Sequence, residues 1–167
     1  MAVVAAAIFA TITSTIIHTK MSTIKDYFNI KELVCKHVYN TFKETKSWEF
    51  FDPKLLETLL FIREGIGKPI TVNNWHIGGN FTQRGLRCNL CQLVLEKSKA
   101  NKIYVSAHMQ GDAVDFDVHG MTAAEVRRWI ADNKEKLPYP IRLENNTNWV
   151  HLDVRNHSTL KISYFNG

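Results

Sequence analysis

Apolar positions recur at helical spacing in the N-terminal half of the chain. Over residues 30–44 they stand three or four positions apart, which predicts an amphipathic helix. Asp52 and Pro53 then supply a helix N-cap followed by proline, and a wide apolar face predicts a second helix that ends before Gly65. A third helix is predicted over about residues 89–98. The first half is therefore expected to be mainly helical.

Strand patterns gather in the second half. Residues 113–118 alternate, with Asp115 and Asp117 on one face and apolar side chains on the other. Thr122 and Glu125 form a capping box that opens a helix to about residue 134. Further strands are predicted at residues 103–105, 141–144 and 149–154, with an edge strand at 160–165, and one strand at residues 69–75 precedes this half. This order predicts an α+β fold, a small antiparallel sheet flanked by helices.

Composition favours one folded domain. The chain has 167 residues, 45% of them hydrophobic, and no repeat or linker divides residues 21–167. The net charge of +5 suits an anionic partner, but the basic residues are scattered and no basic and aromatic pattern typical of nucleic-acid binding is present. We interpret the charge as weak attraction to an acidic surface such as a cell-wall polymer, and we rank a nucleic-acid binder last.

Residues 1–20 are predicted to be separate from that domain. Residues 2–17 are uncharged and shorter than the roughly 20 apolar residues that cross a bilayer, so no stable membrane span is expected. They are similar to the apolar core of a secretory signal but lack a basic segment before it, and Met21 offers a second start of translation. An apolar leader and an artefactual N-terminal extension both stay open as interpretations.

The three cysteines are too few for a disulfide scaffold. Cys88 and Cys91 have the CxxC spacing of half a zinc knuckle or of a redox pair, but no second CxxC or histidine pair completes either pattern. We interpret them as ordinary thiols on a helix face.

Two imidazoles and one carboxylate form the candidate metal site. His108, Asp115 and His151 have the ligand count of a catalytic zinc site, which leaves one position open for water. A turn near Gly111 would bring His108 to Asp115, and strand alternation lets His151 face the same side. The alternative interpretation is that they are surface residues or polar groups with satisfied hydrogen bonds. The histidines without ligand spacing are His37, His76, His119 and His157.

These residues also carry a family resemblance. The pattern SxHxxGxAxD at residues 106–115, followed by WVHxD at 149–153, resembles the zinc D-alanyl-D-alanine carboxypeptidases and murein peptidases, most of all their compact C-terminal catalytic domains. Residues 70–87 are similar to the segment that brings an arginine into the pocket of such enzymes. The resemblance implies a hedgehog-like zinc peptidase fold with His108, Asp115 and His151 as the Zn²⁺ ligands. It also implies a bacterial or phage protein that acts on the cell wall, either exported or delivered by phage lysis.

The chain departs from the family pattern at the general base. Many members have an acidic residue three positions before the last histidine, where this chain has Asn148, and an amide cannot accept the proton. Glu144, the nearest upstream carboxylate, is our candidate base. Arg87 is the first candidate for the cation that steadies the substrate carboxylate or the oxyanion, and Arg84 is the second. Other candidates around the cleft are Asp117 and Asp153 as acceptors for an imidazole, and Trp75 and Trp149 as walls.

The expected function is a monomeric zinc metallopeptidase that hydrolyses peptide bonds of peptidoglycan, as a D,D-carboxypeptidase or a murein endopeptidase. The alternative is a non-catalytic zinc-containing module that binds cell-wall peptide or a protein partner, which Asn148 allows. The similarity of the same core to the hedgehog signalling domain shows that this fold and zinc do not guarantee catalysis. Glu144 distinguishes the two hypotheses, because only an enzyme has turnover to lose when its base is removed.

Overall fold

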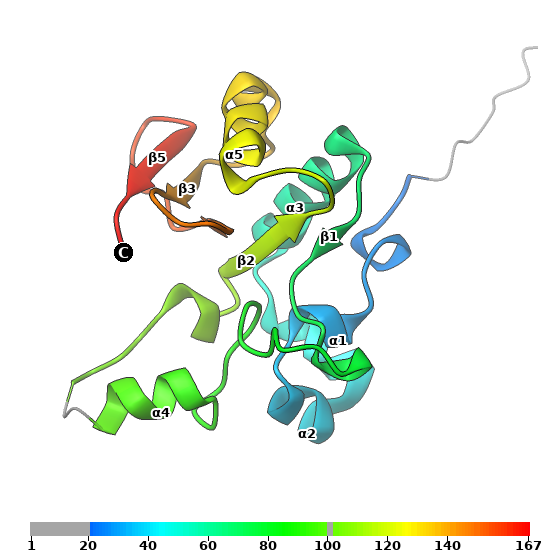
Figure 1. Cartoon of the computed structure of the whole chain (residues 1–167), viewed down its shortest axis with the longest axis vertical. Helices are drawn as coiled ribbons and strands as arrows, with labels where there is room; N and C mark the ends of the chain where they lie inside the picture. The colour runs from blue at the N-terminus through cyan, green and yellow to red at the C-terminus, as the bar shows by residue number, and fades with distance from the viewer. Residues whose placement is uncertain (1–20, 100–101) are drawn as a thin grey trace, which may run out of the picture.

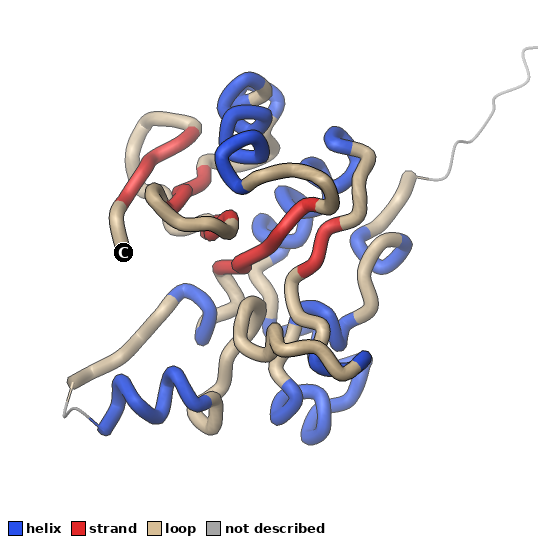
Figure 2. The backbone as a smooth tube through the Cα atoms, in the orientation of Figure 1, coloured by secondary structure: helices blue, strands red, loops and turns tan. Residues whose placement is uncertain are grey.

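The computed structural model describes residues 21–99 and 102–167, so the two interpretations of residues 1–20 fall outside the described residues. The architecture is α+β, with helices over most of the first half and a five-stranded sheet (Figures 1 and 2). The helices are α1 (Ile30–Leu33), α2 (Lys36–Ser47), α3 (Pro53–Ile66), α4 (Gln92–Lys99) and α5 (Ala123–Asp132). The strands are β1 (Ile70–Thr71), β2 (Ala113–Val118), β3 (Ile141–Glu144), β4 (Val150–Asp153) and β5 (Ile162–Phe165).

The sheet has the strand order β1-β2-β4-β3-β5 and is mixed. Its first three pairings are antiparallel, whereas β3 and β5 run parallel, so the prediction of an antiparallel sheet is wrong at this edge. The reason is the route of the chain. After β4 it crosses back over β3 and lays β5 on the far side of that strand, so β5 runs opposite to β4 and therefore along β3. The prediction that residues 160–165 form an edge strand is confirmed.

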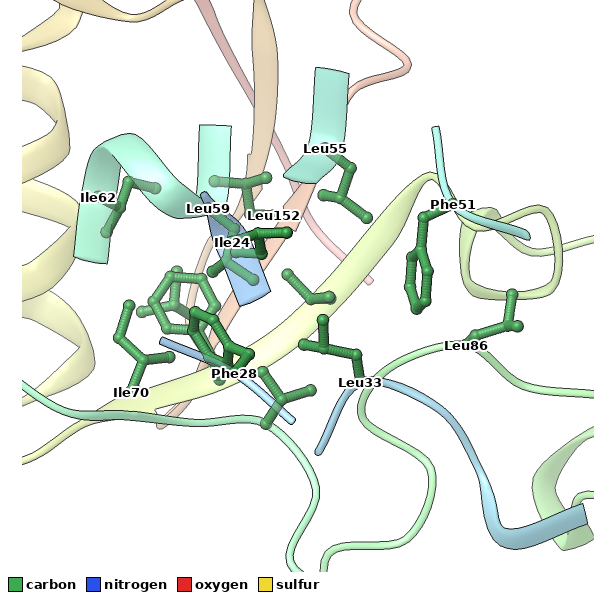
Figure 3. Close-up of a cluster of buried hydrophobic side chains, with 14 of the residues drawn as sticks. Ile24, Phe28, Leu33, Phe51, Leu55, Leu59, Ile62, Ile70, Leu86 and Leu152 are labelled. Atoms are coloured by element: carbon green, nitrogen blue, oxygen red, sulfur yellow. The ribbon is translucent and has the colours of Figure 1, made fainter. Parts of the chain in front are cut away.

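The hydrophobic core lies between the sheet and the N-terminal helices. Leu55, Leu59 and Ile62 of α3 are fully buried and belong to the same hydrophobic cluster as Leu152 of β4 (Figure 3). Full burial of each such side chain contributes roughly 1.5–3 kcal/mol before the entropic cost of ordering is subtracted. Helix α5 contacts β2 and β4, the strands that carry Asp115 and His151. Within residues 21–99 and 102–167, no helix combines the length and apolar character needed to cross a bilayer.

Residues 30–44 do not form one continuous helix, as the apolar spacing predicts, because the chain leaves the helical path between α1 and α2. The carbonyl of Val34 accepts hydrogen bonds from Asn73 Nδ2 at 3.2 Å and from Trp75 Nε1 at 2.9 Å. The N–H of Cys35 donates to Leu86 O at 3.0 Å. These partners lie about 40–50 positions away, so apolar periodicity could not reveal them.

The other predicted elements differ in how closely they match. Asp52 caps α3, which ends at Ile66 with Gly67 in the left-handed region, and the Thr122–Glu125 capping box opens α5. The strand predicted at residues 69–75 reduces to β1, and the one predicted at 103–105 is wrong, since those residues belong to no helix or strand. Helix α4 starts at Gln92, after both cysteines of the CxxC.

Candidate metal centre

Three separate segments supply the candidate ligands. His108 lies in a single-turn 3-10 helix (Ala107–Met109), Asp115 lies on β2, and His151 lies on β4. Asp115 and His151 are directly opposite each other in the antiparallel register, so their side chains share one face of the sheet. Gly111, at φ 77°, turns the chain between His108 and β2, where the sequence predicts a turn. The structure therefore brings the three predicted ligands together.

The donor atoms of these residues face one another. All lie within 4.8 Å of each other. His151 Nδ1 is 2.7 Å from Asp115 Oδ1, and His108 Nε2 is 3.3 Å from His151 Nδ1 and 3.4 Å from Asp115 Oδ2. His108 and Asp115 are buried, and His151 is partly exposed. Two imidazole nitrogens and a carboxylate are thus collected at one point near the surface.

Hydrogen bonds on the far side of each imidazole set its orientation. His108 Nδ1 lies 3.0 Å from the carbonyl of Gly85, which can only accept a hydrogen bond, so Nε2 keeps its lone pair for a ligand. His151 Nε2 lies 3.3 Å from Asp153 Oδ2. Arg142 holds the Asp153 carboxylate in turn, at 2.8 and 3.0 Å. Such outer partners are typical of histidines that bind a metal.

Of the two aspartates that the sequence offers as imidazole acceptors, Asp153 is the one in contact with an imidazole. Asp117 forms an ion pair with Arg84 instead.

The pKa values of the two histidines in the cluster are shifted in opposite directions. Burial lowers the pKa of His108, since the imidazolium form loses its hydration. Burial acts in the same direction on His151, but hydrogen bonds with Asp115 and Asp153 outweigh it and raise the pKa of His151 to about 9. Burial would raise the pKa of Asp115, yet hydrogen bonds from both histidines hold that pKa below its usual range. Without a metal, the cluster therefore holds a neutral imidazole, a carboxylate and an imidazolium near neutral pH.

Two glycines let the backbone approach closely enough to build this cluster. A Cβ on Gly85 would lie 1.8 Å from Leu33 O, and one on Gly111 would lie 1.9 Å from Phe50 O. Real Cβ atoms cannot make such contacts, so a side chain at either position would force the backbone apart. Gly85 matters directly because its carbonyl orients His108.

The candidate ligands border a cavity of about 450 Å³, whose lining also includes Glu144, Arg87 and Trp149. Glu144 lies two positions after Arg142 on β3, so it shares the sheet face that carries Asp153 and His151. Within the described part of the chain, the Glu144 carboxylate forms no side-chain hydrogen bond or ion pair. Ser106 Oγ, which also borders the cavity, is buried and finds no hydrogen-bond partner among the described residues.

The two candidate arginines have different surroundings. Arg87 Nη2 lies 2.8 Å from Asp115 Oδ2, so its guanidinium stands at the ligand cluster. Arg84 pairs with Asp117 and stacks on Phe81 with its guanidinium carbon 3.7 Å from the ring centroid. The aromatic candidates separate in the same way. Trp149 borders the cavity, whereas Trp75 turns its Nε1 to the carbonyl of Val34 and does not line it.

A second group of metal-binding side chains was not predicted. Cys35, His37, Cys88 and Cys91 place one donor atom each within 4.8 Å of one another, and this group can also hold a metal ion. The interpretation of the CxxC as thiols on a helix face is therefore wrong, since both cysteines precede α4 and face Cys35. The signal that could have revealed the group is the spacing Cys35-x-His37, which supplies the second donor pair that the CxxC lacks.

Comparisons of this chain with protein-family models, with curated proteins and with solved structures returned no match. The functional inference therefore depends on the residues and geometry of the site.

Proposed function

We propose that this protein is a zinc-dependent peptidase of the hedgehog-like peptidase fold, acting on peptide bonds of peptidoglycan as a D,D-carboxypeptidase or a murein endopeptidase. The observation that carries the proposal is the convergence of His108, Asp115 and His151, from three segments, at the edge of a substrate-sized cavity. The sequence pattern of residues 106–115 and 149–153 supplies the substrate class.

The donor set fits zinc. Two imidazole nitrogens and one carboxylate oxygen match a catalytic zinc site, and the contacts of His108 with Gly85 and of His151 with Asp153 aim the nitrogens at one point. When bound, zinc supplies a Lewis acid that polarises the scissile carbonyl and makes a water molecule acidic near neutral pH. Three protein ligands leave the side of the cavity open for substrate.

Glu144 is the residue we assign to proton transfer. Its carboxylate borders the cavity and has no ion-pair partner among the described residues, so it is available to accept a proton from water and pass it to the leaving amine. The other carboxylates at the cavity are engaged, Asp115 with the two histidines and Arg87, and Asp153 with Arg142 and His151. Asn148 is exposed in the loop before β4 and is not part of the cavity lining.

Arg87 is assigned to charge stabilisation. One of its amino groups holds Asp115, and the side chain lines the cavity, where its remaining donors can bind a substrate carboxylate or the oxyanion. Further cations around the cavity are Lys97, Arg142 and Arg155. Arg142 pairs with Asp153 and Arg155 pairs with Asp112, so Lys97 and the remaining donors of Arg87 are the cationic groups that can receive a substrate carboxylate.

The test is mass spectrometry of defined muropeptides incubated with the full chain, with zinc present or chelated, beside Glu144→Gln. We expect zinc-dependent products from the wild type, whose masses identify the cleaved bond, and their loss in Glu144→Gln with zinc content unchanged. Glu135→Gln, which replaces an exposed glutamate outside the cavity, is the matched control and should retain turnover. A wild type that binds zinc at His108, Asp115 and His151 but yields no products would overturn the proposal in favour of the non-catalytic module.

A further inference from the structure

The group of Cys35, His37, Cys88 and Cys91 (the cysteine cluster) lies outside the peptidase site. Cys35 is the N-cap residue of α2, and His37 is in the first turn of that helix. Cys88 and Cys91 come from the loop that precedes α4. Two backbone hydrogen bonds tie these segments together, from Cys35 N to Leu86 O at 3.0 Å and from Leu86 N to Leu33 O at 2.8 Å. These bonds hold the segment that begins at Cys35 against the loop that carries Cys88 and Cys91.

The spacing of the donor atoms matches a single tetrahedral ion. For zinc–sulfur and zinc–nitrogen bonds of ordinary length, tetrahedral geometry sets two sulfurs about 3.8 Å apart and a sulfur and a nitrogen about 3.6 Å apart. Cys88 Sγ lies 3.7 Å from Cys35 Sγ, 4.0 Å from Cys91 Sγ and 3.6 Å from His37 Nδ1. Cys91 Sγ lies 4.0 Å from the same nitrogen. A metal ion can enter without rearrangement of the backbone.

Backbone N–H groups also point at the sulfur atoms. Leu90 N donates to Cys88 Sγ and Cys88 N donates to Cys91 Sγ, both at 3.4 Å. A neutral thiol is a weak acceptor, whereas a thiolate is a strong one. Backbone donors directed at the Cys88 and Cys91 sulfurs therefore fit thiolates, which is the form that binds metals.

We propose that Cys35, His37, Cys88 and Cys91 bind a structural zinc ion. Three thiolates and an imidazole are a standard donor set for structural zinc, and four protein ligands leave no position for a substrate. The cysteines are free and Cys35 and Cys91 are almost completely buried, which suits a closed site. The observations behind this site do not depend on the proposed peptidase activity or on its metal.

The position of the cluster gives it a mechanical role. The loop of residues 83–91 carries Arg87, directly before Cys88, and Gly85, whose carbonyl orients His108. Arg87 N also donates to His108 O at 3.0 Å. An ion at the cysteine cluster would fix this loop against α2 and so hold Arg87 and His108 in place.

Metal stoichiometry of the full chain tests the proposal. We expect about two zinc ions per chain for the wild type and about one for Cys88→Ser/Cys91→Ser, measured by elemental analysis after equilibration under reducing conditions. His108→Ala/His151→Ala should lose the other ion. Absence of zinc from the peptidase site can therefore be distinguished from absence of zinc from the cysteine cluster. His37→Ala, at an exposed position, should also bind one ion, whereas His119→Ala, an exposed histidine outside both groups, should bind two.

Cobalt substitution reports on the ligands themselves. Titration of the metal-free protein with Co²⁺ should produce thiolate-to-cobalt charge-transfer absorption in the wild type and in His108→Ala/His151→Ala. That absorption should vanish in Cys88→Ser/Cys91→Ser. If this variant fails to fold, alkylation of the wild type replaces it, because bound zinc should protect all three thiols until the metal is displaced. Unprotected thiols in the zinc-loaded wild type, or a zinc content that is unaffected by His37→Ala, would overturn the proposal.

Discussion

His151 lies between two carboxylates, and its proton is a measurable part of the stability of the metal-free protein. Hydrogen bonds with Asp115 and Asp153 raise the pKa of His151 to about 9, against about 6.5 in an unfolded chain. A raised pKa means that the folded state holds the proton more tightly. The stabilisation is therefore complete below about pH 6.5 and is lost as the pH rises through about 9.

The expected loss is about 3 kcal/mol in the free energy of unfolding, as an upper value. Urea unfolding in the presence of a chelator, measured between pH 6 and pH 10, checks it. The same measurements on His151→Gln serve as the control. This variant lacks the contribution of His151 to the pH dependence but keeps the contributions of all other groups, including the thiols. Equal pH dependence in the two proteins would show that His151 is not held as an imidazolium.

Asp153 is a positioning residue rather than a ligand, since it contacts Nε2 of His151 while Nδ1 faces Asp115. Asp153→Asn removes the charge and keeps the shape, so the imidazole loses basicity and orientation. Removal of such a partner typically weakens metal binding 10–100-fold. Competition with a chromophoric zinc chelator measures this loss.

Asp117→Asn is the matched control for Asp153→Asn. It lies on the same strand as Asp115, but it pairs with Arg84 and contacts neither histidine. The zinc affinity of the Asp117→Asn protein should stay within a factor of about two of the wild-type value. Equal weakening in both variants would mean that charge near the site, and not contact with His151, decides the affinity.

At the scale of elements, the structure depends on a close crossing between the end of α1 and the loop that carries Gly85. A Cβ in Gly85→Ala would meet the backbone carbonyl of Leu33 and not a flexible side chain, so the two segments must separate. We expect a loss of about 1–3 kcal/mol in the free energy of unfolding. Zinc affinity should fall with it, because the Gly85 carbonyl no longer orients His108.

Gly67→Ala separates these effects. Gly67 is at φ 71° with open space around its Cα, so alanine there costs only the strain of the left-handed conformation, about 1 kcal/mol. Thermal unfolding and zinc titration of both variants should show a stability loss in each but weaker zinc binding in Gly85→Ala alone. Unchanged zinc binding in Gly85→Ala would show that the close crossing at Gly85 does not determine zinc affinity at the site of His108, Asp115 and His151.

Elements with local signals could be predicted, and those that depend on distant partners could not. Helices α3 and α5 carry their own caps, and β2 carries its own alternation. The break between α1 and α2, and the parallel edge at β5, depend on hydrogen bonds with residues far along the chain. The candidate ligands follow the same rule. His108 and Asp115 share one motif, whereas the cysteine cluster joins residues about 50 positions apart and was missed.

At the scale of the whole molecule, the loop of residues 83–91 connects two candidate metal sites of different kinds. The site of His108, Asp115 and His151 has three ligands and borders an open cavity. The cysteine cluster has four, two of them almost completely buried. Thiolate-rich, fully coordinated zinc is held more tightly than zinc with three oxygen and nitrogen ligands. The two ions should therefore leave in a fixed order as a chelator is added.

Stepwise chelation should accordingly abolish peptidase activity first, with a smaller fall in the melting temperature than the second step produces. Further chelation should release the second zinc and lower the melting temperature sharply, because an ion present at 100 times its dissociation constant contributes about 2.7 kcal/mol to folding. Zinc content, turnover of a defined muropeptide and thermal unfolding, followed together across the titration, distinguish the steps. Cys88→Ser/Cys91→Ser should show only the first step, from a lower starting melting temperature. If activity and melting temperature of the wild type fall together, the two sites do not differ in zinc affinity. The loop of residues 83–91 then loses its order at both sites in the same step.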